Sequence, residues 1–137
     1  MSQIAAIRKA IVERMQECNV RTQATLSDSG AVPSNGTLAM LALENVRYEE
    51  TFGRLARFTF RVRLMTGKVS ERNAQSRLDT LLSADGDGSL RVALSEPVML
   101  ETQQEATIRV IIAENLGIYQ LGDADYFGGE VVLEVVA

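Results

Sequence analysis

The sequence predicts an α+β domain in which two main helices pack on a roughly four-stranded, mostly antiparallel sheet. Three observations lead to this fold class. The N-terminal segment has apolar residues at helical spacing, residues 57–64 alternate with a period of two just before an amphipathic helix, and the last third holds two strand patterns. At 137 residues the chain suits one domain, 1–137, with one buried core.

The first predicted element is a helix over residues 2–17. Ser2 is placed to cap its N-terminus, and few β-branched residues interrupt it. Its apolar stripe consists of Ile4, Ile7, Ile11 and Met15. The segment 19–37 that follows is rich in turn-forming residues and predicts a long loop or a weak strand with a loop. Loops of this length are often functional, so we expect a contact arm here.

Two strands come next and are expected to form an antiparallel hairpin. The first covers about 40–49, and a polar turn separates it from the second. In the second strand, 57–64, even positions are apolar and odd positions are polar. The polar positions include Arg57, Arg61 and Arg63, so one face of this strand is predicted to be cationic.

The second predicted helix follows the turn at Gly67. Ser70 is expected to cap it, and its apolar stripe consists of Ala74, Leu78, Leu81 and Leu82. The acidic, glycine-containing break at 85–89 lacks the ligand spacing of a calcium loop, so we expect no metal there. Residues 90–94 then predict a short helix or strand that ends before Pro97.

The last third is expected to hold two strands separated by a loop. Residues 105–113 alternate as a strand does, and the four glycines in 115–129 predict a loop with aromatic residues. The chain then finishes on a segment, 130–137, that is apolar on both faces apart from its glutamates. This pattern is typical of a central strand, or of an edge that a partner covers.

Charge is segregated along the chain, whose net charge is -4. Residues 54–77 hold seven basic residues and one acidic residue, whereas 95–137 hold eight acidic residues and one basic residue. The two segments either neutralise each other within one sheet or join the cationic face of one copy to the anionic face of the next, in a ring. The candidate inter-subunit contacts are Arg57, Arg61, Arg63, Asp123, Asp125 and Glu130. Nucleic-acid binding by the basic segment is disfavoured because the chain as a whole is acidic.

The composition excludes much of the chemistry that enzymes use. The chain has no histidine and a single cysteine, Cys18, so the usual metal sites, Ser-His catalysis and an internal disulfide are not expected. We therefore expect no enzyme, no catalytic or metal-binding residue and no cofactor. The competing interpretation is a small ligand-binding or enzymatic domain that uses Asp123, Asp125 and Glu130 as paired carboxylates.

No membrane association is expected. No apolar run approaches the ~20 residues that span a bilayer, and the N-terminal residues lack the pattern of a signal peptide. We expect the protein to stay in the compartment where it is made.

Two segments carry a resemblance to a known family. KVSERNAQSRLDTLL at 68–82, followed by DGDGSLRVAL at 85–94, resembles a region of tail terminator proteins from tailed phages with long noncontractile tails. The ending DADYFGGEVVLEVV at 123–136 is similar to the closing strand of the same family. The resemblance covers about half of the chain, and the segment 19–36 has no counterpart in it.

The resemblance implies an α+β protomer that assembles as a ring, usually of six copies, at the head-proximal end of the tail tube. There it would stop tube polymerisation and offer a surface for joining the head. The implied partners are other copies of the chain, the tail tube protein and a head-tail connector, with DNA passing only through the lumen. The implied location is the tail or neck of the virion, and the host cytoplasm during assembly. Another neck or head-closure adaptor protein is the alternative within this class.

Overall fold

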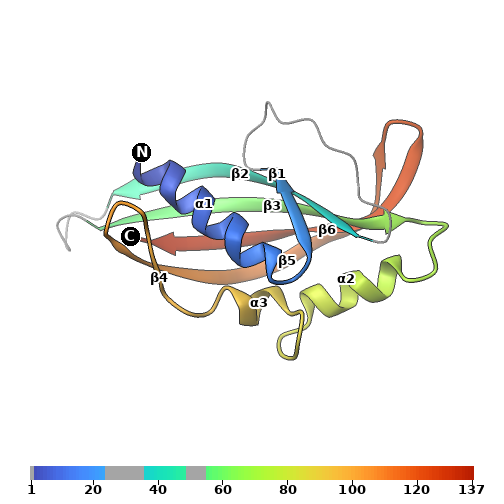
Figure 1. Ribbon diagram of the computed structural model, residues 1–137. Helices are drawn as coiled ribbons and strands as arrows, with labels where there is room; N and C mark the ends of the chain where they lie inside the picture. The colour runs from blue at the N-terminus through green and yellow to red at the C-terminus, as the bar shows by residue number, and fades with distance from the viewer. Residues whose placement is uncertain (1, 24–35, 49–54) are drawn as a thin grey trace.

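The computed structural model describes residues 2–23, 36–48 and 55–137. They form a six-stranded mixed sheet that is curled into a half-barrel, with strand order β1-β2-β3-β6-β5-β4 (Figure 1). The strands are β1 (Val20–Gln23), β2 (Thr37–Tyr48), β3 (Ala56–Lys68), β4 (Val98–Met99), β5 (Glu105–Leu121) and β6 (Ala124–Val136). The helices are α1 (Gln3–Gln16), α2 (Ala74–Leu82) and α3 (Leu90–Ala93).

The prediction of a four-stranded sheet with two packed helices was therefore wrong. Two of the six strands are short: β1 has four residues and β4 has two, which is too few for a periodic pattern to show. The expected loop 19–37 contains β1, which pairs in parallel with the start of β2. The rest of the expected contact arm, 24–35, lies outside the described residues.

The predicted first helix is confirmed. α1 begins after Ser2, whose hydroxyl oxygen accepts a hydrogen bond from the Ala5 N–H. Its apolar stripe is buried, and α1 lies across the sheet in Figure 1. The stripe belongs to one hydrophobic core, which also includes side chains from α2 and α3 and from the helix-facing side of β3 and β6. The most deeply buried large side chains of that core include Phe58, Phe60, Leu64, Leu94 and Leu133.

The predicted hairpin and the position of the last strand are also confirmed. β2 pairs with β3 in antiparallel register, and β6 lies between β3 and β5 in the middle of the sheet. Along β3 the even residues from Phe58 to Leu64 face the core. The odd residues from Arg57 to Arg63 therefore lie on the opposite face, because side chains alternate along a strand.

The second helix starts later than expected. α2 begins at Ala74, so Ser70 lies in the preceding turns and does not cap it. An interaction between Arg77 and the end of β3 holds the helix instead. Arg77 donates from Nε to the Thr66 carbonyl at 2.9 Å and pairs with Glu71 at 2.7 Å. The buried Thr66 hydroxyl donates in turn to the Ala74 carbonyl at 2.7 Å.

The expected glycine-rich loop 115–129 is instead a β-hairpin that β5 and β6 form together. Gly128 and Gly129 lie inside β6, where a Cβ on Gly128 would be only 2.2 Å from the Leu64 carbonyl oxygen. These glycines allow close packing within the sheet and do not mark a loop. Of the four glycines in 115–129, Gly122 alone has a positive φ, 63°, and occupies a turn position that favours glycine. The hairpin tip stands clear of the other described elements in Figure 1.

Among the described residues, no helix combines the length and apolarity that crossing a membrane requires.

Candidate interaction surface

Four of the six charged residues singled out in the sequence lie on the face of the sheet opposite the three helices: Arg57, Arg61, Arg63 and Glu130. We call this surface the charged face. In the sheet, β3 lies between β2 and β6, and β5 pairs with the other side of β6. The members of the charged face are Glu44, Arg57, Arg61, Arg63, Glu114, Glu130 and Glu134.

Arg61 is at the centre of the charged face and contacts carboxylates from three other strands. Its Nε donates to Glu44 of β2 at 2.5 Å, and its Nη1 donates to Glu114 of β5 at 2.8 Å. Glu130 of β6 lies 3.6 Å from the same Nη1. Hydrogen bonds to Glu44 and Glu114 raise the pKa of the Arg61 guanidinium above its usual value. One cation is therefore surrounded by three carboxylates.

The other two arginines also have partners within the chain. Arg57 pairs with Glu134 of β6 at 2.9 Å. The Arg63 guanidinium lies over the ring of Tyr119, 5.4 Å from its centroid, in a cation–π contact. Burial raises the pKa of the Tyr119 hydroxyl, and the nearby Glu130 raises it further. Of the two arrangements considered from the sequence, neutralisation within one sheet therefore holds for Arg57 and Arg61.

The structure does not bring the three predicted carboxylates together. Asp123 lies in the turn at the hairpin tip, and Asp125 is in the first residues of β6. Both are exposed. Glu130 is five residues farther along β6 than Asp125, roughly 17 Å at strand spacing. It accepts a hydrogen bond from the Asn115 side-chain amide at 2.8 Å. A pair of carboxylates positioned for acid–base chemistry is thus not formed by these three residues.

Sequence reasoning missed Glu44, Glu114 and Tyr119 as members of this surface. Tyr119 lies within the segment 115–129 that was expected to be a loop, and Glu114 directly precedes it. Without a predicted strand pairing for this segment, the neighbours of these two residues could not be assigned. Glu44 sits at a bulge where the pairing of β2 with β3 shifts by one residue. Simple alternation along β2 could not reveal that its side chain reaches Arg61.

Beyond the charged face, the β5–β6 hairpin exposes apolar side chains. Leu116 is 58% exposed and Ile118 is 60% exposed, although both belong to a strand. The acidic residues Asp123 and Asp125 lie at the tip of the same hairpin. An apolar and acidic projection of this kind suits contact with another protein surface.

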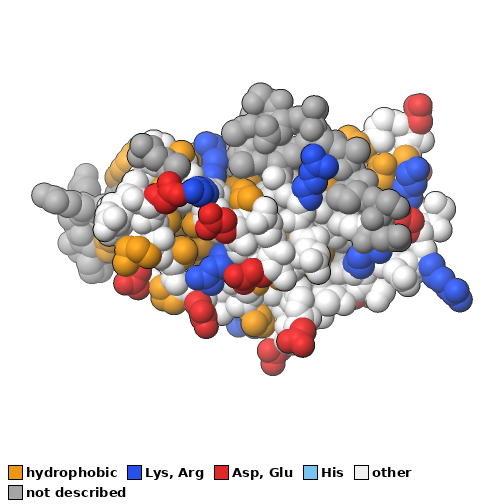
Figure 2. Space-filling model, viewed as in Figure 1, with side chains coloured by type: hydrophobic (Ala, Val, Ile, Leu, Met, Phe, Trp, Pro, Cys, Tyr) orange, Lys and Arg blue, Asp and Glu red, His pale blue; other side chains and the backbone are white. Residues whose placement is uncertain are grey.

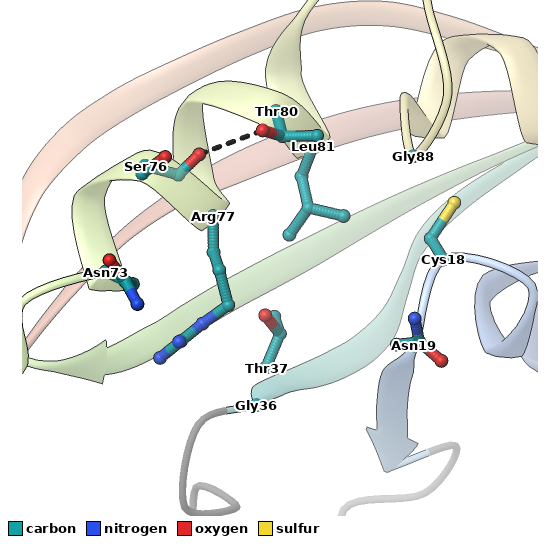
Figure 3. A pocket seen from close by; sticks show the side chains of 10 residues that line it. All are labelled: Cys18, Asn19, Gly36, Thr37, Asn73, Ser76, Arg77, Thr80, Leu81 and Gly88. Atoms are coloured by element: carbon teal, nitrogen blue, oxygen red, sulfur yellow. Dashed lines mark hydrogen bonds between the residues drawn. The ribbon is translucent and has the colours of Figure 1, made fainter.

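A separate hollow of about 310 Å³ lies between α2 and the segments around Cys18 and Thr37 (Figure 3). Arg77 contributes to its wall, but its guanidinium already donates to the Thr66 carbonyl and pairs with Glu71. Burial raises the pKa of the Cys18 thiol, and Glu17 beside it adds to the effect. The thiol is therefore held in its protonated and less nucleophilic form, and the hollow has no activated nucleophile at Cys18.

The helix-bearing face also has acidic and basic side chains interspersed over it (Figure 2).

A scan against models of known protein families and a search of curated proteins found no match to this chain.

Proposed function

We propose that this chain is a structural virion protein that forms a ring of six copies at the head-proximal end of a phage tail tube. There it ends tube polymerisation and presents a surface for joining the head. In this proposal the protein acts by binding other proteins and not by catalysis. Its partners are further copies of itself, the tail tube protein and a head-tail connector, and DNA only passes through the lumen.

The observation that carries the proposal is the projecting β5–β6 hairpin. A strand that leaves Leu116 and Ile118 more than half exposed places apolar area where a neighbouring copy can cover it. Because these side chains are 58% and 60% exposed, covering each of them contributes about 1–2 kcal/mol. The hairpin projects at one end of the sheet, where it can contact a different surface of the next copy. A contact between two different surfaces is heterologous, and repeated from copy to copy it can close into a ring.

The resemblance supports the same assignment. Its first segment forms α2 and α3, and its last forms β6, so the resembling residues are in contact in the folded chain. The contacts predicted from the sequence all remain proposals. Asp123 and Asp125 lie on the exposed hairpin. Arg61 and Glu130 would reach a neighbouring copy only as part of the charge cluster that they form within the chain. Arg57 and Arg63 complete the predicted set.

The proposal is tested in assembled particles. Gold-labelled antibodies against this chain should mark the tail–head junction in electron micrographs, and the purified protein should halt growth of its tube protein in vitro. Label along the tube, or tubes that lengthen as before, would contradict the proposal. Label on tailless heads alone would favour the neck-adaptor alternative.

Charge-introducing variants sharpen the test. Leu116→Asp combined with Ile118→Asp should abolish ring formation and tube capping, because each carboxylate would be buried at the contact. Val92→Asp is the matched control, since Val92 is also exposed (44%) but lies on α3. Equal loss of rings in both variants would indicate a general defect and not a hairpin contact.

A further inference from the structure

β5 has a long outer edge that the described part of the chain leaves almost unpaired. β4 pairs only through Val98 and Met99, with Ala106 and Glu105 respectively. From Thr107 onward no described strand lies beside β5 on that side. An unpaired strand edge presents a row of N–H and C=O groups that can accept another strand.

Pro97 and Arg14 explain why β4 stops so early. Pro97 is the next residue that would lie beside β5, and its ring fixes φ at roughly −65°, far from the roughly −140° of an antiparallel strand. Its carbonyl accepts a hydrogen bond from Arg14 of α1 at 3.3 Å, and Arg14 also donates to the Ala93 carbonyl at 3.2 Å. The chain is therefore drawn toward α1 and away from β5.

The pairing of β4 with β5 shows which N–H and C=O groups of β5 point toward the open edge. The Leu100 N–H donates to the Gln104 carbonyl at 2.7 Å, which fixes the phase of the antiparallel pairing. Since these groups alternate with a period of two, those of Ile108 and Val110 point toward the open edge. The register shift with β6 between Val110 and Ile112 comes only after them.

Beside this edge runs a hollow that continues the line of β4. Its first part, about 470 Å³, lies between α3 and residues 107–111, and a second part of about 290 Å³ lies next to 110–113. The two parts share Arg91, Val110 and Ile111 in their walls. Together they follow seven residues of β5, roughly 23 Å of strand. We call this the β5 groove.

The β5 groove is apolar along its floor and basic at its sides. Ile111 and Ile112 are 44% and 48% exposed there. Arg91 and Arg109 line it, and neither forms an ion pair with a described residue. Glu134 is the cross-strand neighbour of Arg109, but it forms its ion pair with Arg57. The groove thus lacks the negative charge that would complement it.

We propose that the β5 groove binds an extended segment of another polypeptide that carries both apolar and acidic residues, as an added strand next to β5. The segment continues the antiparallel pairing that β4 begins. One carboxylate lies on the face of Arg109, a second lies on the opposite face near Arg91 of α3, and the other side chains are apolar. Main-chain hydrogen bonds supply affinity and the arginines supply selectivity. A second copy of this chain is the less suitable occupant. At the opposite edge of the sheet, β1 pairs only with the start of β2, and residues 41–48 of β2 lie beyond this pairing. They contain one acidic residue and also the basic Arg47. The proposal does not depend on the function in a phage tail.

The test uses synthetic peptides of about eight residues, a common strand length. One peptide consists of valine with two glutamates, one on each face of the strand, and the matched peptide has lysine in place of both glutamates. At low salt the acidic peptide should bind the full-length protein about tenfold more tightly, which is the effect of about 1.4 kcal/mol from two exposed charge pairs. In hydrogen-exchange NMR it should protect the amides of Ile108 and Val110.

Two variants and a control complete the experiment. Arg91→Glu with Arg109→Glu should reverse the preference in favour of the lysine peptide, a gain that unfolding cannot produce. Val110→Pro removes an outward N–H and should abolish binding of both peptides. Arg21→Glu with Arg72→Glu, both exposed residues away from the groove, should change nothing.

Three results would overturn the proposal. Equal binding of the two peptides to the unaltered protein would remove the role of Arg91 and Arg109. Amides protected elsewhere, with Ile108 and Val110 unchanged, would place the site outside the β5 groove. Protection of these two amides without peptide, increasing with protein concentration, would show that a second copy of the chain fills the groove.

Discussion

At the scale of single residues, Arg61 connects four strands through three carboxylates. Such a cluster is stable only while the cation is present, since Glu44, Glu114 and Glu130 would otherwise repel one another. The arginines were recognisable from their alternation in β3, but their partners were not. Those partners come from strands whose register the sequence does not specify.

Replacing Arg61 by leucine should destabilise the fold, because three carboxylates lose their common partner on a partly exposed surface. The loss should shrink in about 1 M salt, where exposed charges are screened. Urea unfolding at low and high salt measures both values. A loss that is the same at both salt concentrations would show that packing, and not charge, is responsible.

Cys18 offers a test of how burial affects a titratable group. Its raised thiol pKa means that less thiolate is present at any given pH than in an unstructured peptide. The rate of alkylation by iodoacetamide should therefore reach its midpoint at a higher pH in the folded protein. Unfolding in urea should restore the profile of a free cysteine peptide. A folded-state midpoint at or below that of the peptide would contradict the burial argument.

At the scale of elements, helices with a complete apolar stripe were predictable and sheet edges were not. α1 and α2 each bury such a stripe, and β3 shows a clean period of two. β1 and β4 are too short to have a pattern, and Pro97 limits β4 to two residues. The β5–β6 hairpin was misread because its glycines were taken as loop residues, although the close approach of β6 to β3 requires Gly128.

The need for glycine inside β6 can be measured directly. Gly128→Ala should destabilise the protein by about 1–3 kcal/mol or more, because the new Cβ would meet the Leu64 carbonyl oxygen on the neighbouring strand. Gly117→Ala is the matched control in β5, where nothing lies within 4 Å of the added atom. Thermal unfolding should separate the two variants clearly. Similar melting temperatures would mean that β6 can shift to admit a side chain.

At the scale of the whole molecule, the curled sheet separates two kinds of surface. The charged face satisfies most of its charges within the chain, whereas the hairpin and the β5 groove leave apolar side chains and backbone groups open. The open features are therefore the better candidates for contacts between proteins. From the sequence, the candidate contacts were the arginines of β3 together with Asp123, Asp125 and Glu130, of which only Asp123 and Asp125 lie at the hairpin. The hairpin could not have been proposed before β5 and β6 were known to pair.

Electron microscopy of the purified full-length protein tests the central claim most directly. The account predicts closed rings with a central opening and six copies, and it predicts that these rings disappear in the Leu116→Asp, Ile118→Asp variant while Val92→Asp retains them. A uniform population of monomers, or open filaments that never close, would contradict it.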